Sequence, residues 1–274
     1  MGFFEAIVMA VLQGVTELFP ISSLGHAVIF PRLVGWGDLV HNPEFLPYLV
    51  VMHLGTAVAL FIYFWRDWMA FLNGVLKADT PRAFADRRTF LFVVLATVPA
   101  VIVGFVLHKP LEHAFSNPSL VAFVLILNGA LLYFSDQLGG RGVGQLDQLN
   151  WRGALAIGVA QCFALVPGFS RSGLTIVAGA FAGLKHEDAA RFSFLMATPI
   201  ILGATVLEAP KLLHSGATLG GAALLSGVIA GVVAYASLWV LMRYFHTHEF
   251  RAMKPFAYYC AGAGLFSLLV MAFI

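Results

Sequence analysis

Four residues carry side chains able to do acid–base or nucleophilic chemistry beside proline and glycine breaks in an otherwise apolar chain: Glu17, Ser23, His26 and Arg171. Ionisable groups cost free energy in a membrane and usually mark functional sites. A serine with a histidine three residues beyond it on one helix face brings a hydroxyl within reach of a proton carrier. A guanidinium is a forked donor suited to phosphate oxygens. We therefore predict catalytic roles for these four residues on a substrate that carries phosphate.

The first cluster also contains groups that could hold a metal. Gln13 and Glu17 are four residues apart and share a helix face, and Pro20 ends that helix. A carboxylate with an amide beside it suits Mg²⁺ or Ca²⁺, which could bridge to a diphosphate. Glu17 could instead orient His26. The sequence leaves both roles open.

The second cluster repeats this geometry. Pro167 and Gly168 break the chain, Ser170 can cap a new helix, and Arg171 lies on the first turn of that helix. Free backbone amides at two such helix N-termini attract anions. The sequence predicts that the following residues bind the substrate: Gln13, Ser22, Gly25, Gly168, Ser170, Ser172 and Thr175.

Each of these residues also has a structural interpretation. The serines at the breaks could cap helices only, and Gln13 and Thr175 could bond across helices. Glu17 and Arg171 could form a structural ion pair. His53, on a neighbouring apolar stretch, could reach the same cavity or be a hydrogen-bonded core residue.

The composition indicates an all-α integral membrane protein. Hydrophobic residues make up 60% of the chain, charged residues 11%, and the mean hydropathy is +0.87. A net charge of +2 is too small for electrostatic binding of nucleic acid, so no nucleic-acid partner is expected. Cys162 and Cys260 lie in apolar surroundings without metal-ligand spacing, and we interpret both as packing residues.

The elements that must position these residues are six transmembrane helices and two broken segments. The predicted spans are Leu46–Tyr63, Phe90–Leu107, Leu120–Phe134, Phe192–Leu207, Leu219–Leu241 and Pro255–Ile274. Segments Phe3–Val34 and Trp151–Leu184 are each interrupted by proline, and a half-helix cannot span a bilayer. We therefore predict two re-entrant helical hairpins whose breaks line a common cavity.

The order of a broken segment followed by three spans occurs twice. Pro20 and Ser23 match Pro167 and Ser170 at an offset of 147 residues. Because each copy holds an odd number of spans, the second is expected to be inverted relative to the first. We predict one membrane domain, 1–274, made of a first repeat (1–140) and a second, inverted repeat (151–274).

Basic residues alternate between the loops, as expected if they collect on the cytoplasmic side. One loop is expected to hold Arg66, Lys77, Arg82, Arg87 and Arg88, and the other loops on that side hold Arg141, Arg152, Lys185, Arg191, Arg243, Arg251 and Lys254. The intervening loops hold only Lys109 and Lys211. This pattern places both termini and the mouth of the first broken segment outside.

At these residues the chain resembles the undecaprenyl-diphosphate phosphatase family of bacterial inner membranes, the bacitracin-resistance type. The resemblance rests on Gln13 with Glu17, on Pro20 through His26 and on Pro167 through Thr175, and it extends over nearly the whole chain. It implies a hydrolase, assisted by Mg²⁺ or Ca²⁺, that removes one phosphate from undecaprenyl diphosphate and recycles the lipid carrier for peptidoglycan. It also implies a site open to the periplasm. Membrane lipids are expected partners, and a homodimer is left open.

Carried over to this sequence, the resemblance implies that Gln13 and Glu17 serve the metal or the water, and that Ser23 has the nucleophilic or positioning role. It implies that His26 transfers protons and that Arg171, with Ser170 and Thr175, binds the diphosphate. Leu24 departs from the family pattern, which usually has threonine there, and His53 stands where glutamine is expected. Whether Ser23 attacks phosphorus or His26 activates water remains open. The alternative function is a transporter or flippase of a phosphorylated lipid or small anion, because inverted repeats with broken helices are also a transporter architecture.

Overall fold

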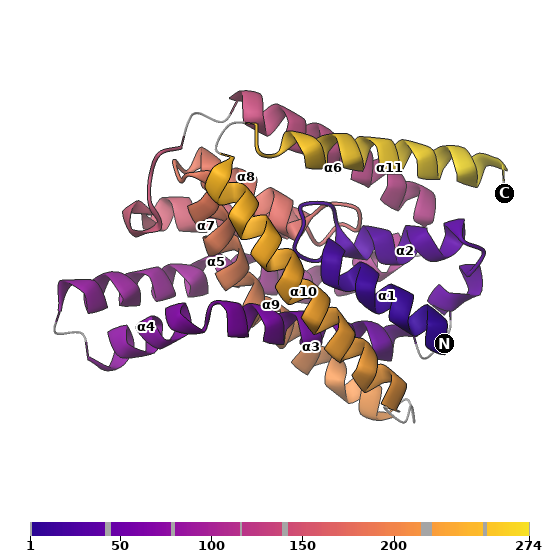
Figure 1. Ribbon diagram of the computed structural model, residues 1–274, viewed down its shortest axis with the longest axis horizontal. Coiled ribbons are helices and arrows are strands. Elements are labelled where there is room, and N and C mark those ends of the chain that lie inside the picture. The colour runs from indigo at the N-terminus through magenta and orange to yellow at the C-terminus, as the bar shows by residue number, and fades with distance from the viewer. Residues whose placement is uncertain are drawn as a thin grey trace.

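The computed structural model describes residues 2–41, 45–77, 80–115, 117–138, 142–214, 221–248 and 251–273, and the description below concerns these residues. They are almost entirely helical (Figure 1). The α-helices are, in chain order, α1 (Phe3–Thr16), α2 (Ser23–Leu33), α3 (Phe45–Tyr63), α4 (Trp65–Leu76), α5 (Pro81–Phe115), α6 (Pro118–Leu138), α7 (Trp151–Phe163), α8 (Arg171–Phe181), α9 (His186–His214), α10 (Gly221–Thr247) and α11 (Lys254–Phe273).

The structure confirms an all-helical, multi-pass membrane protein. Within the described residues, the helices α5, α6, α9, α10 and α11 are long and apolar enough to cross a bilayer. A sixth candidate is the pair α3 and α4, which together pass the same test but are bent by 70° at their junction. The six predicted spans fall within α3, α5, α6, α9, α10 and α11, although Leu219 and Ile274 lie outside the described residues.

The helix α4 corrects the sequence prediction, which placed Arg66 in the same loop as Arg88. Arg66 lies in α4 and Arg88 lies in α5. The segment is helical because it is amphipathic: Phe71 and Gly74 are buried, while most of its other residues face outward. A Cβ atom added at Gly74 would lie 2.6 Å from the carbonyl oxygen of Ala83, so glycine allows α4 to pack closely on α5.

Two pairs of long helices form the frame of the molecule. The helices α6 and α11 lie side by side, and α3 packs along α10, which crosses the molecule obliquely in Figure 1. The first helix of each broken segment packs on the other half of the chain, α1 against α10 and α7 against α5. Such reciprocal packing is expected of two related halves. The division into repeats 1–140 and 151–274 stays a prediction.

Small residues make these crossings possible. Lipid tails are as apolar as the helix surfaces, so helices in a membrane associate mainly by close packing. A Cβ atom at Gly55 of α3 would collide with the backbone of Gly227 in α10. A Cβ atom at Gly158 of α7 would lie 2.5 Å from the carbonyl oxygen of Ala96 in α5. Glycine is therefore required where α3 crosses α10 and where α7, the first helix of the second broken segment, packs on α5.

Candidate functional site

Both predicted breaks exist, and each is followed by a helix with a serine cap. The helix α1 ends at Thr16 and α2 begins at Ser23, while α7 ends at Phe163 and α8 begins at Arg171. The hydroxyl oxygens of Ser22 and Ser170 accept hydrogen bonds from the backbone amides of Gly25 and Gly173, each at 3.1 Å. The predicted caps are confirmed at both helices.

The backbone at the breaks departs from ordinary helix or strand geometry. Ser22 has a φ of 70°, which is rare for a residue with a side chain and is found mostly where surrounding structure enforces it. Gly168 has a φ of 105°, and a Cβ atom there would lie 2.5 Å from the carbonyl oxygen of Val121. The predicted binding position at Gly168 thus has a conformation and a tight packing that only glycine fits.

The two breaks contact each other directly. The Ser172 hydroxyl donates to the carbonyl oxygen of Phe19 at 3.1 Å. A Cβ atom at Gly25 would lie 3.4 Å from the Cα atom of Gly168. Residues that are about 150 positions apart in the sequence are therefore neighbours, and the N-termini of α2 and α8 converge as predicted.

Asn128 of α6 joins the two breaks from the side. Its Nδ2 atom donates to the carbonyl oxygen of Pro20 at 3.1 Å, and its Oδ1 atom accepts from the backbone amide of Ser170 at 3.0 Å. The side chain is fully buried. The sequence analysis did not identify Asn128, because a single asparagine in an apolar span shows nothing of what it contacts.

The Glu17 carboxylate is the centre of the site. It is buried, and its Oε2 atom accepts from the Ser23 hydroxyl at 2.6 Å and from Gln13 Nε2 at 3.1 Å. The Nε2 atom of His53 lies 3.5 Å from the same oxygen. Arg171 Nη2 donates to the other oxygen, Oε1, at 3.0 Å. The carboxylate thus collects donors from α1, α2, α3 and α8.

One terminal nitrogen of Arg171 has no hydrogen-bond partner in the described structure. Its Nη1 atom is buried and has no hydrogen-bond partner within the described part of the chain, although its Nη2 atom is paired with Glu17. A buried guanidinium nitrogen without a partner is costly unless a ligand satisfies it. Arg171 is also the first residue of α8, and the N-terminus of a helix favours an anion.

His26 is hydrogen-bonded to Ser22 and Tyr259, and not to Ser23 or Glu17 as the sequence analysis considered. Its Nδ1 atom lies 2.7 Å from the carbonyl oxygen of Ser22, and its Nε2 atom lies 2.9 Å from the hydroxyl of Tyr259 in α11. The rings of His26 and Tyr259 are stacked, with centroids 5.7 Å apart and planes at 15°. Ser23 therefore bonds to Glu17 rather than to His26.

The remaining predicted residues mainly shape the second break. The hydroxyl oxygens of Ser170 and Ser172 lie 3.1 Å apart. The Thr175 hydroxyl lies 2.6 Å from that of Ser193 in α9 and donates to the carbonyl oxygen of Arg171 at 2.7 Å. This is the bond across helices that the structural interpretation of Thr175 anticipated.

The metal-ligand groups at Glu17 and Gln13 are compatible with a divalent cation only if the substrate supplies further ligands. Among the described residues, no three His, Cys, Asp or Glu side chains gather into a metal-binding group. Glu17 and Gln13 offer one carboxylate and one amide. Mg²⁺ is commonly bound by one or two carboxylates together with substrate phosphates and water, so this small donor set fits a cation shared with a diphosphate.

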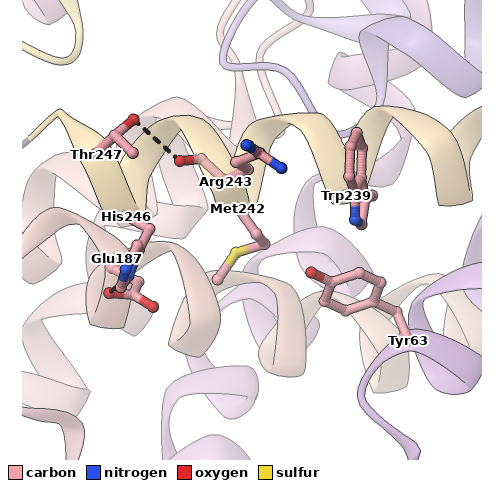
Figure 2. A pocket seen from close by; sticks show the side chains of 7 residues that line it. All are labelled: Tyr63, Glu187, Trp239, Met242, Arg243, His246 and Thr247. Atoms are coloured by element: carbon pink, nitrogen blue, oxygen red, sulfur yellow. Dashed lines mark hydrogen bonds and ion pairs between the residues drawn. The ribbon is translucent and has the colours of Figure 1, made fainter.

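A pocket of about 450 Å³ lies elsewhere, between α3, α9 and α10 (Figure 2). In it the Glu187 carboxylate is 3.0 Å from His246 Nδ1, and the Arg243 guanidinium lies over the ring of Trp239. None of the predicted site residues lines this pocket. Arg243 of this pocket therefore offers a control for Arg171 of the site.

Comparison with known proteins gives a consistent result. Residues 6–266 match the family described as "Bacitracin resistance protein BacA". The chain is 50% identical to an undecaprenyl-diphosphatase of Acidiphilium cryptum, with 98% of each chain covered. It is 48% identical to an undecaprenyl-diphosphatase of Granulibacter bethesdensis, with 100% of this chain and 98% of the relative covered. A protein of Chromobacterium violaceum called undecaprenyl-diphosphatase 2 is 46% identical, with 98% and 99% covered.

Proposed function

Because the chain belongs to the bacitracin resistance protein BacA family, we propose that it hydrolyses undecaprenyl diphosphate to undecaprenyl phosphate and inorganic phosphate. The product is the lipid carrier used in peptidoglycan synthesis, and its recycling gives the protein its role in bacitracin resistance. The cell location that follows is the bacterial inner membrane, with the site open to the periplasm. The loop charges support that orientation.

The observation that carries this proposal is the buried Nη1 atom of Arg171, which has no partner in the described structure while Nη2 is paired with Glu17. A phosphate oxygen that reaches Nη1 can accept a hydrogen bond from it while Nη2 stays paired with Glu17. The N-termini of α2 and α8 add backbone dipoles of the same sign. Together they form a positive environment for the terminal phosphate of the substrate.

Ser23 and Glu17 have the geometry of a nucleophile and its base. At 2.6 Å, the Glu17 carboxylate can take the proton of the Ser23 hydroxyl as its oxygen attacks the terminal phosphorus. The bond from that phosphorus to the bridging oxygen breaks, and undecaprenyl phosphate leaves. Water then cleaves the phosphoserine to release inorganic phosphate and restore the serine. In the alternative route, an activated water attacks phosphorus directly and Ser23 only positions the substrate.

The pairing of Arg171 with Glu17 links binding to reactivity. While Arg171 Nη2 donates to Glu17, the negative charge of the carboxylate is partly neutralised and it is a weak proton acceptor. A diphosphate that draws the guanidinium toward itself weakens this pair. When substrate is present, Glu17 can then either accept the Ser23 proton or bind a cation together with Gln13, and these two roles are alternatives for the same carboxylate.

A divalent cation, Mg²⁺ or Ca²⁺, completes the proposal. Glu17 and Gln13 would hold it, and it would neutralise charge on the diphosphate. Removal of divalent cations with a chelator is expected to reduce phosphate release by at least tenfold, and added Mg²⁺ or Ca²⁺ is expected to restore it. Undiminished release after chelation would remove the cation from the proposal.

The test of the function is phosphate release from undecaprenyl diphosphate by the purified protein. Arg171→Ala is expected to lower kcat/KM by about 10²- to 10³-fold, as loss of a single charge-stabilising donor does in other enzymes. Arg243→Ala, which removes an arginine from the separate pocket of Figure 2, is the matched control and should keep normal turnover. Movement of lipid across vesicles without phosphate release would instead identify a transporter.

A further inference from the structure

The contact between His26 and the backbone of Ser22 determines which ring nitrogen of His26 carries hydrogen, and Tyr259 contacts the other nitrogen. The carbonyl oxygen of Ser22 can only accept a hydrogen bond, so Nδ1 of His26, at 2.7 Å, must be the protonated nitrogen. The ring is buried, and no carboxylate bonds to it among the described residues, which favours its neutral form. Nε2 is then an acceptor, and the hydroxyl of Tyr259 donates to it at 2.9 Å.

Tyr259 is well placed to hold this arrangement. It comes from α11, the last helix of the chain, and its ring stacks on the imidazole at 15°. The opposite side of the imidazole is tied to the first break through Ser22. The orientation of His26 is thus fixed at both nitrogens, by backbone on one side and by a phenol on the other.

We propose that Tyr259 is a positioning residue that keeps His26 neutral with Nε2 as its basic nitrogen, and that its hydroxyl occupies Nε2 until the reacting water takes its place. This inference rests on the proposed phosphatase function for its catalytic consequence. The exchange forms and breaks only hydrogen bonds: the tyrosine hydroxyl keeps its proton, and Nε2 becomes free to accept one from the reacting group. His26 can then serve proton transfer in the orientation that Tyr259 preserved.

The matched variants are Tyr259→Phe and Tyr258→Phe. The first keeps the ring stacked on His26 and removes only the hydroxyl. The second makes the same change at the neighbouring residue, whose ring packs near Tyr133 and is exposed. Tyr259→Phe is expected to lower kcat about tenfold with KM changed less than about twofold, and Tyr258→Phe to leave both unchanged.

A double-mutant cycle separates positioning from mere packing. If Tyr259 acts through His26, then Tyr259→Phe should have less than about a twofold effect on kcat in a His26→Ala background. An equal tenfold loss in both backgrounds would overturn the proposal, and so would an unchanged kcat for Tyr259→Phe alone.

A second measurement decides the proposal without activity. In ¹⁵N-histidine-labelled protein, the His26 signals are those missing from His26→Ala, and they are expected to show protonated Nδ1 and unprotonated Nε2. The Nε2 signal should shift in Tyr259→Phe and stay in place in Tyr258→Phe. Protonated Nε2, or an Nε2 signal insensitive to Tyr259→Phe, would overturn the inference. Absence of phosphate release by wild-type protein would overturn the proposed function while leaving this measurement valid.

Discussion

The hydrogen bond from Ser23 to Glu17 distinguishes two reaction routes at the scale of single residues. At 2.6 Å it is the short contact expected of a hydroxyl and an ionised carboxylate. The sequence pointed to His26 as the proton acceptor because it lies three residues beyond Ser23. In the structure, the Ser23 hydroxyl donates its hydrogen bond to Glu17 instead. Spacing along a helix shows which residues share a face but not which partner reaches them first from another element.

Replacement of Ser23 by alanine tests the nucleophilic route. We expect Ser23→Ala to lower kcat by on the order of 10³-fold or more, because the attacking oxygen is lost and the remaining groups act only on charge and position. Phosphate release under saturating substrate measures the effect. Ser135→Ala is the control, since within the described residues its hydroxyl bonds only to the backbone of its own helix at Leu132. A residual rate within about tenfold of wild type would favour activated water.

His53 is a second residue whose role depends on its neighbours. Its Nδ1 atom lies 2.8 Å from the carbonyl oxygen of Leu49, so Nδ1 carries hydrogen and Nε2 faces Glu17 at 3.5 Å. Only a protonated Nε2 can bond to a carboxylate oxygen, and a charged imidazole there would add to the positive environment for phosphate. The sequence left two interpretations of His53, a residue that reaches the site and a hydrogen-bonded core residue. Its contact with Glu17 favours the first.

We expect His53→Gln to lower kcat/KM about tenfold, mainly by raising KM, because glutamine keeps a hydrogen-bonding group but lacks the positive charge of a protonated imidazole. Kinetics with undecaprenyl diphosphate measure this, and His248→Gln, at an exposed position on the end of α10, is the control. A variant with unchanged KM would show that the charge of His53 does not contribute to binding.

At the scale of elements, Asn128 keeps the two half-helical segments together. Asn128→Leu should destabilise the protein by about 2–5 kcal/mol, because it leaves the carbonyl oxygen of Pro20 and the amide of Ser170 buried without partners. Asn128→Asp keeps the acceptor for Ser170, but it replaces the donor to the Pro20 carbonyl oxygen by a buried carboxyl oxygen and should also lose stability. Thermal unfolding in detergent measures both. Equal stability of the leucine variant and wild type would show that the breaks are held by other contacts.

The crossing of α3 and α10 depends on two glycines that face each other. Gly55→Ala should lower stability by about 1–3 kcal/mol, because its Cβ atom would enter the backbone of Gly227 and force the helices apart. Gly262→Ala in α11 is the control, since no atom of another described helix lies within 4 Å of its added Cβ atom. Thermal unfolding should show a loss for the first variant and no loss for the second.

Much of the element layout could be predicted from the sequence because its signals are local. Proline and glycine in an apolar stretch predict a break, and a serine after the break predicts a cap, which is confirmed at Ser22 and Ser170. The helix α4 was missed because its charged residues resemble a loop, and its buried face becomes clear only against α5. Asn128 and Tyr259 were missed because their partners lie on other helices.

At the scale of the whole molecule, the site is built by both halves of the chain. Glu17 and Ser23 come from the first broken segment and Arg171 from the second, and Asn128 and Tyr259 approach from the paired helices α6 and α11. Neither half alone contains the carboxylate together with its guanidinium. Each broken segment consists of half-helices that are too short to cross a bilayer, and the two breaks meet inside the protein, where irregular backbone is shielded from lipid.

The orientation of the whole molecule follows from its basic residues and can be measured. If they lie on the cytoplasmic side, the segment that contains Val143 is inside and the start of α1 is outside. In a background with Cys162→Ala and Cys260→Ala, we expect Phe3→Cys to react with a membrane-impermeant thiol reagent applied to spheroplasts of a bacterium. Val143→Cys should react only after the membrane is permeabilised. Both positions are exposed, at 61% and 84%, so access from the correct side is not limited by the fold. The opposite labelling pattern would place the mouth of the first broken segment in the cytoplasm, and the substrate would then have to be dephosphorylated on the inner leaflet.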